Sequence, residues 1–426
     1  MERATWLNRD KQVVWHPFTQ MLTADEPLLI ERAKDTLLFD ADGSSYIDAN
    51  SSWWVNVHGH GHPLILQAIA EQFTQVDHVI FAGATHKQAI KLAERVVRIL
   101  PKHFSKVFFS DDGSTAVEVA LKMVFQYWFN KNKPKKRIVA LEGAYHGDTF
   151  GAMAIGQRGY FNDPFEHFFF DVDFVPFPDK SHEAEALAKA QELFETGEVA
   201  GIIVEPLIQG SAGMRMYSPE WLDQLIVLAH RYEVLVVFDE VMTGWGRTGR
   251  LFAMDHCEYK PDLVCLSKGL TGGTLPLGLT VATEEIYEAF LHPEKTKALL
   301  HGHSYTGNPL VCAAANASLD IFEQDQTWAN IERIERSHTQ FLTELDQQPN
   351  AVNASVLGTI LRFEIETGEG NTYFSDIRDK AYRYFLENGC LIRPLGNVVF
   401  VNPPYCITEE EMRKLYRVIL DFLKLL

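Results

Sequence analysis

Cysteine is scarce in this chain: only five of its 426 residues are cysteines. They are scattered without the CxxC spacing of a zinc site, and an odd number of them does not suggest a disulfide framework. The first residues, Met1 to Trp6, also lack the apolar core of a secretion signal. We therefore expect a cytoplasmic protein without structural disulfides or zinc.

Basic residues are in the minority, and long apolar runs are missing. The chain has 39 Lys and Arg against 57 Asp and Glu, a formal net charge of −18. This charge argues against a surface for nucleic acid or for an anionic membrane, because phosphates attract cations. No apolar segment approaches the length of a membrane span. We therefore expect neither nucleic acid nor a membrane among the partners.

The remaining composition is that of an ordinary globular protein. Hydrophobic residues make up 46% of the chain and charged residues 23%, and no repeat or low-complexity segment is present. A chain of 426 residues exceeds one compact core. The length therefore predicts two domains.

Short apolar runs alternate with helical patterns from about residue 63 onward. The predicted strands are residues 107–109, 138–140, 199–204, 234–238, 263–266 and 279–282. This alternation indicates an α/β protein with a mainly parallel sheet, covered by helices on both faces. A hairpin at residues 36–47 comes before this region, and long amphipathic helices follow it. We predict a large domain at 52–324 and a smaller α+β domain built from 1–51 and 325–426.

Two charged residues lie at the ends of predicted buried strands. Asp239 ends the run 234–238, and Lys268 follows the run 263–266 after one serine. A lone charge in such a place is costly unless it is paired, neutralised or chemically used. A desolvated lysine loses its proton readily and becomes a nucleophile toward carbonyl groups. Taken singly, Asp239 could instead cap a helix and Lys268 could lie at the surface.

Pyridoxal phosphate enzymes need this pair of residues. The lysine forms a Schiff base with the cofactor, and a carboxylate keeps the pyridinium nitrogen protonated. Ligands of open α/β sheets bind at the carboxyl ends of the strands, which places Asp239 and Lys268 in one cleft. The pair therefore predicts a pyridoxal phosphate site.

Two further segments fit the same cofactor. Residues 110–115 follow a predicted strand and precede a helix, so that Gly113 and Ser114 offer a cradle for a phosphate. A capping box of Thr115 with Glu118 is the structural alternative. Tyr145 follows the strand 138–140 at the same edge of the sheet and offers a flat ring, although a packed core tyrosine is its alternative.

These segments, in this order along nearly the whole chain, resemble the class III pyridoxal phosphate aminotransferases of fold type I. The resemblance implies pyridoxal 5′-phosphate as cofactor, with Lys268, Asp239 and Tyr145 as catalytic residues. The segment 205–210 resembles the strand-end segment that carries a cofactor-binding glutamate, here Glu205. The loop 301–309 resembles one that closes the phosphate site of the neighbouring subunit, here through Ser304. An obligate homodimer with shared active sites is therefore implied.

Other segments resemble the branch of this family that forms 7,8-diaminononanoate in biotin synthesis. These segments are residues 15–20, 51–54, 210–217 and 392–396. The branch implies transfer of an amino group to 8-amino-7-oxononanoate, with S-adenosylmethionine as the expected donor. It implies a substrate site of Phe18, Trp53, Trp54, Gly302, Arg393 and Phe400. The guanidinium of Arg393 is suited to hold a carboxylate through two hydrogen bonds, and the tryptophan pair would line an apolar channel, although such pairs more often belong to a core.

Departures from the family keep alternatives open. Met242 stands where the ornithine and γ-aminobutyrate branches carry glutamine, which disfavours those substrates. Phe18 and Phe400 replace tyrosines of better-known relatives, and a variant group uses lysine as donor. A transaminase for another ω-amine is a further alternative. A non-catalytic regulator is disfavoured because the lysine and the phosphate cradle are both present.

Three histidines, His58, His60 and His62, alternate with glycine. On a strand this period would place them on one face, as in a metal site. No carboxylate or cysteine completes a ligand set nearby, so we predict no metal.

Overall fold

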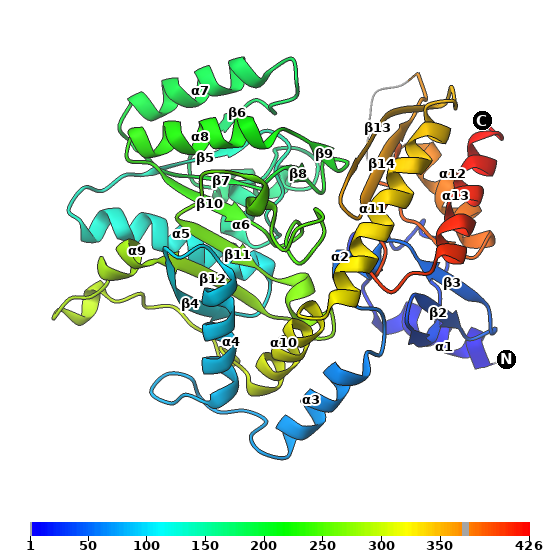
Figure 1. Cartoon of the computed structure of the whole chain (residues 1–426), viewed down its shortest axis with the longest axis horizontal. Coiled ribbons are helices and arrows are strands. Elements are labelled where there is room, and N and C mark those ends of the chain that lie inside the picture. Colours follow the sequence, from blue (N-terminus) through cyan, green and yellow to red (C-terminus); the bar gives the residue numbers. More distant parts are fainter. Residues whose placement is uncertain (1, 369–374) are drawn as a thin grey trace.

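The apolar runs of the middle of the chain form one seven-stranded sheet (Figure 1). The computed structural model describes residues 2–368 and 375–426. The sheet has the order β4-β12-β11-β10-β7-β5-β6. Its strands are β4 (Phe104–Ser110), β5 (Arg137–Leu141), β6 (Val172–Val175), β7 (Val199–Val204), β10 (Leu235–Asp239), β11 (Leu263–Leu266) and β12 (Gly278–Thr283). All neighbours pair in parallel except β12, which is antiparallel to β11 and β4. The predicted mainly parallel sheet is confirmed.

Both faces of this sheet are buried, which explains why its strands are apolar without alternation. On one face, Val139, Ile202 and Val236 belong to a core that includes residues of α4 (Lys87–Ile99), α7 (Glu183–Glu195) and α8 (Pro219–Arg231). On the other face, the neighbouring strand residues pack against α5 (Gly113–Asn130). Complete burial of a Val or Ile side chain contributes about 1.5–3 kcal/mol to the free energy of folding. Because both faces are buried, the strands and their ends are held firmly in place.

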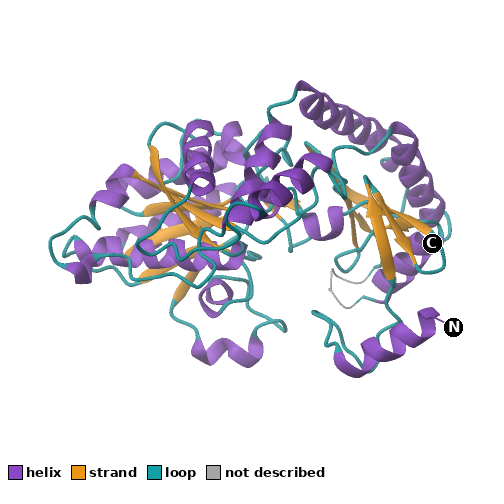
Figure 2. Ribbon diagram, turned by 90° about the horizontal axis from the view of Figure 1, so that it is seen from below, coloured by secondary structure: helices purple, strands orange, loops and turns teal. Residues whose placement is uncertain are grey.

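Helix α10 (Pro309–Phe322) leads from the large part of the molecule to the smaller one. The shorter elements of the chain are α2 (Ser51–Trp54), α3 (Pro63–Phe73), α6 (Phe150–Ala154), α9 (Glu284–Glu288), η1 (Asp163–Phe168), η2 (Ala253–His256), η3 (Lys268–Thr271), η4 (Lys295–Lys297), β8 (Ile208–Gln209) and β9 (Arg215–Met216). Figure 2 shows the two parts side by side, with strands in each.

The smaller part combines both ends of the chain, as the α+β prediction requires. One sheet has the order β1-β2-β3-β15, and the other has the order β13-β14-β16. The elements are α1 (Glu2–Val13), β1 (Ile30–Lys34), β2 (Leu37–Asp40), β3 (Ser45–Asp48), α11 (Asp325–Leu345), β13 (Ala351–Leu357), β14 (Ile360–Ile365), α12 (Asp376–Glu387), β15 (Cys390–Leu391), β16 (Val398–Val401) and α13 (Glu409–Leu423). Strand β15 runs parallel to β3, which joins the two ends. The residue boundaries of the domains stay a prediction.

The start of α5 differs from the structural alternative considered for it. The helix begins at Gly113, and its cap is Asp112, whose side chain accepts the N–H of Thr115 at 2.8 Å. Glu118 does not take part in a capping box with Thr115. Its carboxylate instead accepts the N–H groups of Gly151 and Ala152 in α6. The proposed capping box was therefore wrong, because the helix begins at Gly113 with Asp112 as its cap and Thr115 already lies in its first turn.

The three histidines do not share the face of a strand. His60 makes only an isolated bridge with Asp35, and its Nε2 donates to Asp48 at 2.9 Å. His58 Nε2 lies 2.9 Å from the Ser318 hydroxyl. The geometric premise of a common face was wrong because the segment is a loop. Across residues 2–368 and 375–426 the structure shows no group of three His, Cys, Asp or Glu residues placed to hold a metal ion.

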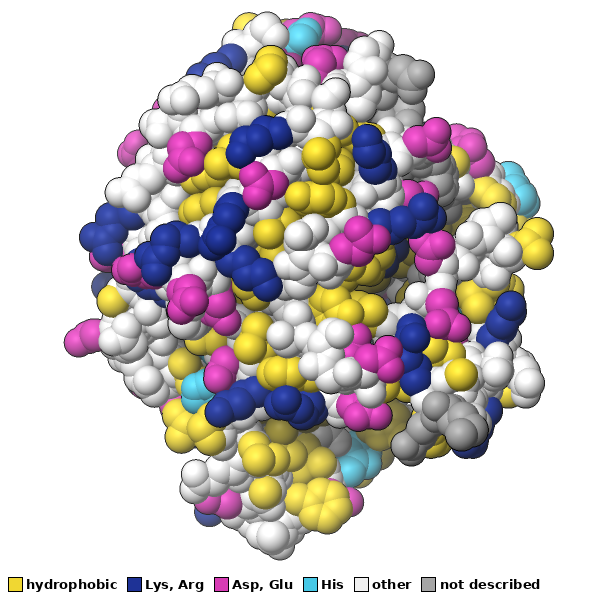
Figure 3. All heavy atoms as spheres, turned by 90° about the vertical axis from the view of Figure 1, so that its right-hand side faces the viewer, with side chains coloured by type: hydrophobic (Ala, Val, Ile, Leu, Met, Phe, Trp, Pro, Cys, Tyr) yellow, Lys and Arg dark blue, Asp and Glu magenta, His cyan; other side chains and the backbone are white. Residues whose placement is uncertain are grey.

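Charged groups of both signs are interspersed on the face of the smaller part that Figure 3 shows. Within the residues that the structure describes, no helix is both long and apolar enough to cross a membrane.

Candidate active site

A cavity of about 690 Å³ opens at the carboxyl ends of the parallel strands. Its walls include Ser114, Tyr145, Asp239 and Lys268, four residues that the sequence predicts to meet there, and also Trp54. The residues come from separate strand ends and one helix start, so the sheet edge determines their spacing. The fold thus brings the predicted cofactor residues together.

Lys268 follows strand β11 after one residue, Ser267, and is the first residue of η3. Its φ of 48° lies in the left-handed region, which is strained for a residue with a Cβ. The side chain is partly buried in the cavity wall, with Nζ 4.8 Å from the ring centre of Trp54. Desolvation lowers the pKa of Lys268 to about 8, although Asp239 and Glu205 act against this shift. Its amine therefore becomes available as a nucleophile near neutral pH.

Asp239 ends β10 with its carboxylate almost completely buried. One oxygen accepts a hydrogen bond from His146 Nδ1 at 2.7 Å, and the other accepts the N–H of Val241 at 3.1 Å. His146 also lines the cavity, and its Nε2 is buried without a partner in the protein. The imidazole therefore holds the carboxylate in one orientation.

His146 is a functional candidate that the sequence reasoning did not single out. Its one signal is its position, directly after Tyr145 in a loop at the same sheet edge. Its hydrogen bond to Asp239 joins two residues that are far apart in the sequence, so only the tertiary structure shows it.

Ser114 lies in the first turn of α5, facing the loop that precedes α6. Its hydroxyl lies 2.8 Å from the Thr149 hydroxyl and accepts the N–H of Thr149 at 3.1 Å. Gly147 comes so close that a Cβ there would lie 2.3 Å from Ser114 Oγ, and its φ is 122°. Glycine is therefore required at 147 for the loop to approach the helix start. Thr149 lines the cavity too and is a second candidate that was missed.

Tyr145 and Glu205 connect two neighbouring strand ends. Glu205 accepts the N–H of Tyr145 at 3.1 Å through one oxygen and the N–H of Gly210 at 2.9 Å through the other. The Tyr145 hydroxyl donates to Asp148 at 3.0 Å. Burial raises the pKa of Glu205 to about 7 and also raises the pKa of the Tyr145 phenol. Glu205 thus orders the backbone on either side of the cavity.

These groups fit pyridoxal phosphate by chemistry and by arrangement. An amine for the aldehyde, a carboxylate for the ring nitrogen and a hydroxyl at a helix start for the phosphate all line one cavity. The unpartnered Nε2 of His146 in the same wall indicates that a polar ligand completes the site.

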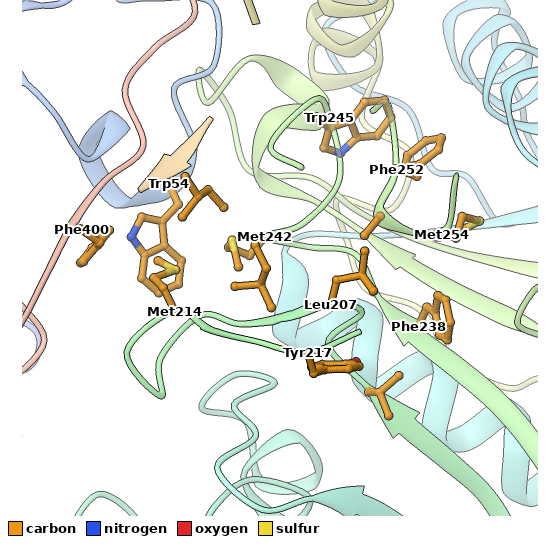
Figure 4. Packing of buried hydrophobic residues seen from close by; sticks show 14 of the residues in the cluster. Trp54, Leu207, Met214, Tyr217, Phe238, Met242, Trp245, Phe252, Met254 and Phe400 are labelled. Carbon is orange, nitrogen blue, oxygen red and sulfur yellow. The ribbon is translucent and has the colours of Figure 1, made fainter. Parts of the chain in front are cut away.

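The predicted substrate residues form an aromatic wall beside this cavity. Trp54 packs edge-on against Phe400, with ring centres 6.0 Å apart, as Figure 4 shows. Trp53 lies 5.4 Å from Phe18 by ring centres, and the Arg393 guanidinium lies 5.4 Å from the Trp53 ring. Of these five residues only Trp54 lines the cavity itself. Phe400 is buried, whereas the side chains of Phe18 and Trp53 are exposed to solvent.

Gly302 and Ser304 are not brought to the cavity of their own chain. Both are exposed in the loop before α10, and neither is among the cavity-lining residues. Their neighbour His303 pairs with Asp111 at 3.3 Å, which places the loop beside the turn before α5.

Comparison with known proteins agrees with this geometry. The family model described as "Aminotransferase class-III" matches residues 21–423 of this chain. A relative from Synechococcus elongatus, named adenosylmethionine-8-amino-7-oxononanoate aminotransferase, is 46% identical over 418 residues, covering 96% of this chain and 98% of the relative.

Solved structures are similar over the same extent. The crystal structure of the identically named enzyme of Methanocaldococcus jannaschii has 37% identity and a TM-score of 0.94, and the match covers 99% of both chains. A PLP-bound amine transaminase from an uncultivated Pseudomonas species has 26% identity and a TM-score of 0.89, covering 96% of this chain and 97% of the other. A family match along nearly the whole chain, with the lysine, carboxylate and phosphate cradle in one cavity, establishes that the chain belongs to the class III aminotransferases.

Proposed function

We propose that this chain transfers an amino group to 8-amino-7-oxononanoate and so forms the 7,8-diaminononanoate of biotin synthesis. S-adenosylmethionine is the donor and pyridoxal 5′-phosphate is the cofactor. Support comes from the names of the relatives and of the similar solved enzyme. The observation that carries the proposal is the meeting of Lys268 and Asp239 in one cavity beside the wall of Trp53, Trp54 and Arg393.

The cofactor-binding residues each address one part of the cofactor. Lys268 would hold the aldehyde carbon, Asp239 the ring nitrogen, and Gly113 with Ser114 the phosphate. When bound, the cofactor supplies an aldehyde that accepts an amine and a ring that delocalises the electron pair left when a carbon loses its proton. Asp239, which His146 orients, would keep the proton on the ring nitrogen. Tyr145 offers its ring as a flat neighbour.

Lys268 moves the proton in both halves of the reaction. With a pKa near 8, its amine exists in both protonation states at physiological pH. As a base it takes the proton from the amine-bearing carbon of the donor, and as an ammonium group it returns one to the accepting carbon. Asp239 and Trp54 in the cavity wall are almost completely buried, which strengthens electrostatic interactions in this part of the site.

The aromatic wall suits an acceptor with an apolar chain and a terminal carboxylate. Arg393 supplies the guanidinium for the carboxylate, and the rings of Trp53 and Trp54 line the path of the chain. Phe18 extends this wall at its exposed side. Phe18 and Phe400 contribute packing but no hydroxyl, so the polar contacts of the acceptor must come from other groups.

A homodimer with shared active sites belongs to the same proposal. Ser304 lies outside the cavity of its own chain and on an exposed loop. In the proposed dimer it would complete the phosphate site of a second copy, with Gly302 beside the substrate. Exposed apolar side chains occur on α3, on the loop that follows it and on the loop before α10, including Phe73, Ile80 and Leu300. Contacts such as that of His78 with Tyr305, 5.4 Å apart by ring centres, join these segments into one surface that a partner would bury.

The direct test has two half-reactions. Purified protein with bound cofactor is incubated with S-adenosylmethionine or with lysine, and the change of the cofactor spectrum to the pyridoxamine form is followed. We expect conversion by S-adenosylmethionine, followed by formation of 7,8-diaminononanoate when 8-amino-7-oxononanoate is added. Conversion by lysine but not by S-adenosylmethionine would show that lysine is the amino donor and that the proposed donor is wrong.

A second outcome would reject the acceptor. If the protein transfers amino groups between pyruvate and simple ω-amines but leaves 8-amino-7-oxononanoate unchanged, the chain is a transaminase of other specificity. Measuring both acceptors on the same preparation separates that result from an inactive sample.

A further inference from the structure

Asn50 lies at the junction where three segments of the substrate wall meet. It directly precedes α2, which carries Trp53 and Trp54, and its side chain is only 3% exposed. Its Oδ1 accepts the backbone N–H of Arg393 at 2.6 Å, and its Nδ2 donates to the backbone carbonyl of Phe400 at 2.9 Å. An N–H can only donate and a carbonyl can only accept, so the two partners fix the orientation of the amide.

The side chain of Asn50 replaces a backbone hydrogen bond that is not formed beyond the end of the β3–β15 pair. Ile47 and Ala49 donate their N–H groups to the carbonyls of Gly389 and Leu391, as parallel strands do. The next hydrogen bond of this parallel pattern would join the N–H of Arg393 to the carbonyl of Ala49. That carbonyl already accepts the N–H of Asn402 at 2.9 Å. Asn50 therefore supplies the acceptor that the Arg393 N–H would otherwise lack.

The turn after Asn50 is strained and needs this support. Ser51, Ser52 and Trp54 all have positive φ, between 48° and 66°. The Asn50 carbonyl accepts the N–H of Trp54 at 3.0 Å, so the same residue anchors the tryptophan turn through its backbone and Arg393 through its side chain. The position of the guanidinium relative to the aromatic wall thus depends on one buried amide.

We propose that Asn50 is a positioning residue for the carboxylate-binding site, joining the Trp53–Trp54 turn to Arg393 and Phe400. It acts through Arg393 and touches no substrate itself. This inference rests on the proposed function, in which Arg393 binds the carboxylate of the acceptor. It adds that the affinity for a carboxylate depends on the amide of Asn50.

The test uses two small probes whose binding does not require turnover. Heptanoate carries an apolar chain and a carboxylate, and heptan-1-ol is its uncharged match. Titration calorimetry on the holoenzyme measures their dissociation constants for wild type, Asn50→Leu, Arg393→Met and the double variant. We expect Asn50→Leu to weaken heptanoate binding about tenfold and heptan-1-ol binding less than twofold. In the Arg393→Met background, Asn50→Leu should change heptanoate binding by less than about twofold.

A matched control separates positioning from loss of stability. Asn130 is also buried, and its Nδ2 donates to the carbonyls of Ala289 and Lys297 at the end of α5 that lies away from the cavity. Asn130→Leu should lower thermal stability as Asn50→Leu does, without any change in heptanoate affinity. Equal weakening of both probes by Asn50→Leu, unchanged heptanoate binding, or a wild type that does not prefer heptanoate over heptan-1-ol would overturn the inference. Turnover of 8-amino-7-oxononanoate is measured separately and tests only the proposed function.

Asn50→Asp provides a second test if the leucine variant does not fold. The aspartate keeps an acceptor for the Arg393 N–H but, when ionised, turns a second oxygen toward the Phe400 carbonyl. Protonation restores a donor at that oxygen. The ratio of heptanoate dissociation constants, variant over wild type, should therefore fall as pH decreases from 8 to 6. A ratio that does not change with pH would contradict the assigned hydrogen bonds.

Discussion

Lys268 combines three unfavourable features: a strained backbone, a desolvated amine and a position at the end of a buried strand. Such features persist where chemistry uses them, because each one costs stability. Asp239 shows the same pattern with a carboxylate, which His146 orients from a loop 93 positions away in sequence. At the scale of single residues, an ionisable group that is buried in an apolar environment thus points to a functional site.

Replacing Lys268 with alanine removes the only amine that the proposal uses. We expect Lys268→Ala to lose the visible absorbance band of the covalently bound cofactor and to reduce turnover at least about 10³-fold. Circular dichroism should remain that of the wild type. Turnover at the wild-type rate would exclude Lys268 as the proton carrier.

Asp239→Asn keeps the shape of the side chain and removes its charge. The ring nitrogen of the cofactor then lacks an anionic partner, so turnover should fall about 10²- to 10³-fold while cofactor is still bound. The rate of the donor half-reaction, followed by stopped-flow spectroscopy, checks this. An unchanged rate would mean that the carboxylate serves only to hold His146.

At the scale of elements, the start of α5 connects stability with the phosphate site. Asp112 caps the helix, and the following residues Gly113 and Ser114 face the cavity. A helix start offers free N–H groups and a positive dipole end, so one element provides both a rigid support and an anion site. The cap is therefore expected to influence cofactor affinity.

Asp112→Ala should lower the free energy of unfolding by about 1 kcal/mol. It should also weaken cofactor binding severalfold, because the first turn that carries Ser114 loosens. Thr408→Ala provides the control, since Thr408 caps α13 through a capping box with Glu411, far along the chain from the cavity residues. Chemical denaturation and cofactor titration of both variants check the prediction. A similar loss of cofactor affinity in both variants would speak against a specific role of the α5 cap.

Three elements of the smaller part meet at His338. The ring on α11 donates from Nε2 to the carbonyl of Thr359 at 3.2 Å, so Nδ1 must accept from the Tyr416 hydroxyl of α13 at 2.9 Å. Burial lowers the pKa of His338 to about 3, from 6.5. Between these values the unfolded chain binds a proton that the folded chain excludes, so stability decreases as pH falls below 6.5.

His338→Gln removes this titration. From pH 7 to pH 5.5 we expect the wild type to lose about 1 kcal/mol more than the variant, since one proton corresponds to about 1.4 kcal/mol per pH unit. Urea unfolding at the two pH values measures the difference, and other titrating groups cancel between the two proteins. Parallel pH curves would show that His338 binds protons equally in the folded and the unfolded chain, so that folding does not lower its pKa.

At the scale of the whole molecule, the proposed active site combines segments from both chain ends and from a second copy. Strand β15 pairs with β3, which brings Arg393 beside the Trp53–Trp54 turn. Ser304 lies outside the cavity of its own chain. A closed two-fold dimer would place the same loop of each copy at the site of the other.

Mixing two inactive variants tests the shared site. One chain carries Lys268→Ala and the other carries Ser304→Glu, whose charge would repel the cofactor phosphate. In a mixed dimer one site combines the intact lysine with the partner's intact serine, so co-expression should restore about one quarter of wild-type activity under random pairing. Each variant alone should stay inactive. No restoration, despite mixed dimers detected by mass spectrometry, would contradict the shared site.

Much of the fold could be predicted from the sequence because apolar runs between helical patterns specify a parallel sheet without further information. The strands at 199–204 and 263–266 appear at the predicted residues. Strand β1 could not be anticipated: its five residues include three charged ones and are mostly exposed, and its pairing with β2 alone makes it a strand. The capping box at Thr115 failed for a local reason, since the helix begins at Gly113 and Asp112 caps it.

The sequence by itself indicated which residues are proposed to carry the chemistry, because a lysine and an aspartate at the ends of buried strands are costly wherever the strands lie. Only the tertiary structure decided what orients them. His146 supports Asp239, Thr149 faces Ser114, and Asn50 holds Arg393 through hydrogen bonds between residues far apart in the chain. The physical reason is the distance along the chain over which each feature is determined. Burial of a strand can be predicted from neighbouring residues. A hydrogen bond requires two groups within about 3 Å, and only folding brings sequence-distant groups that close.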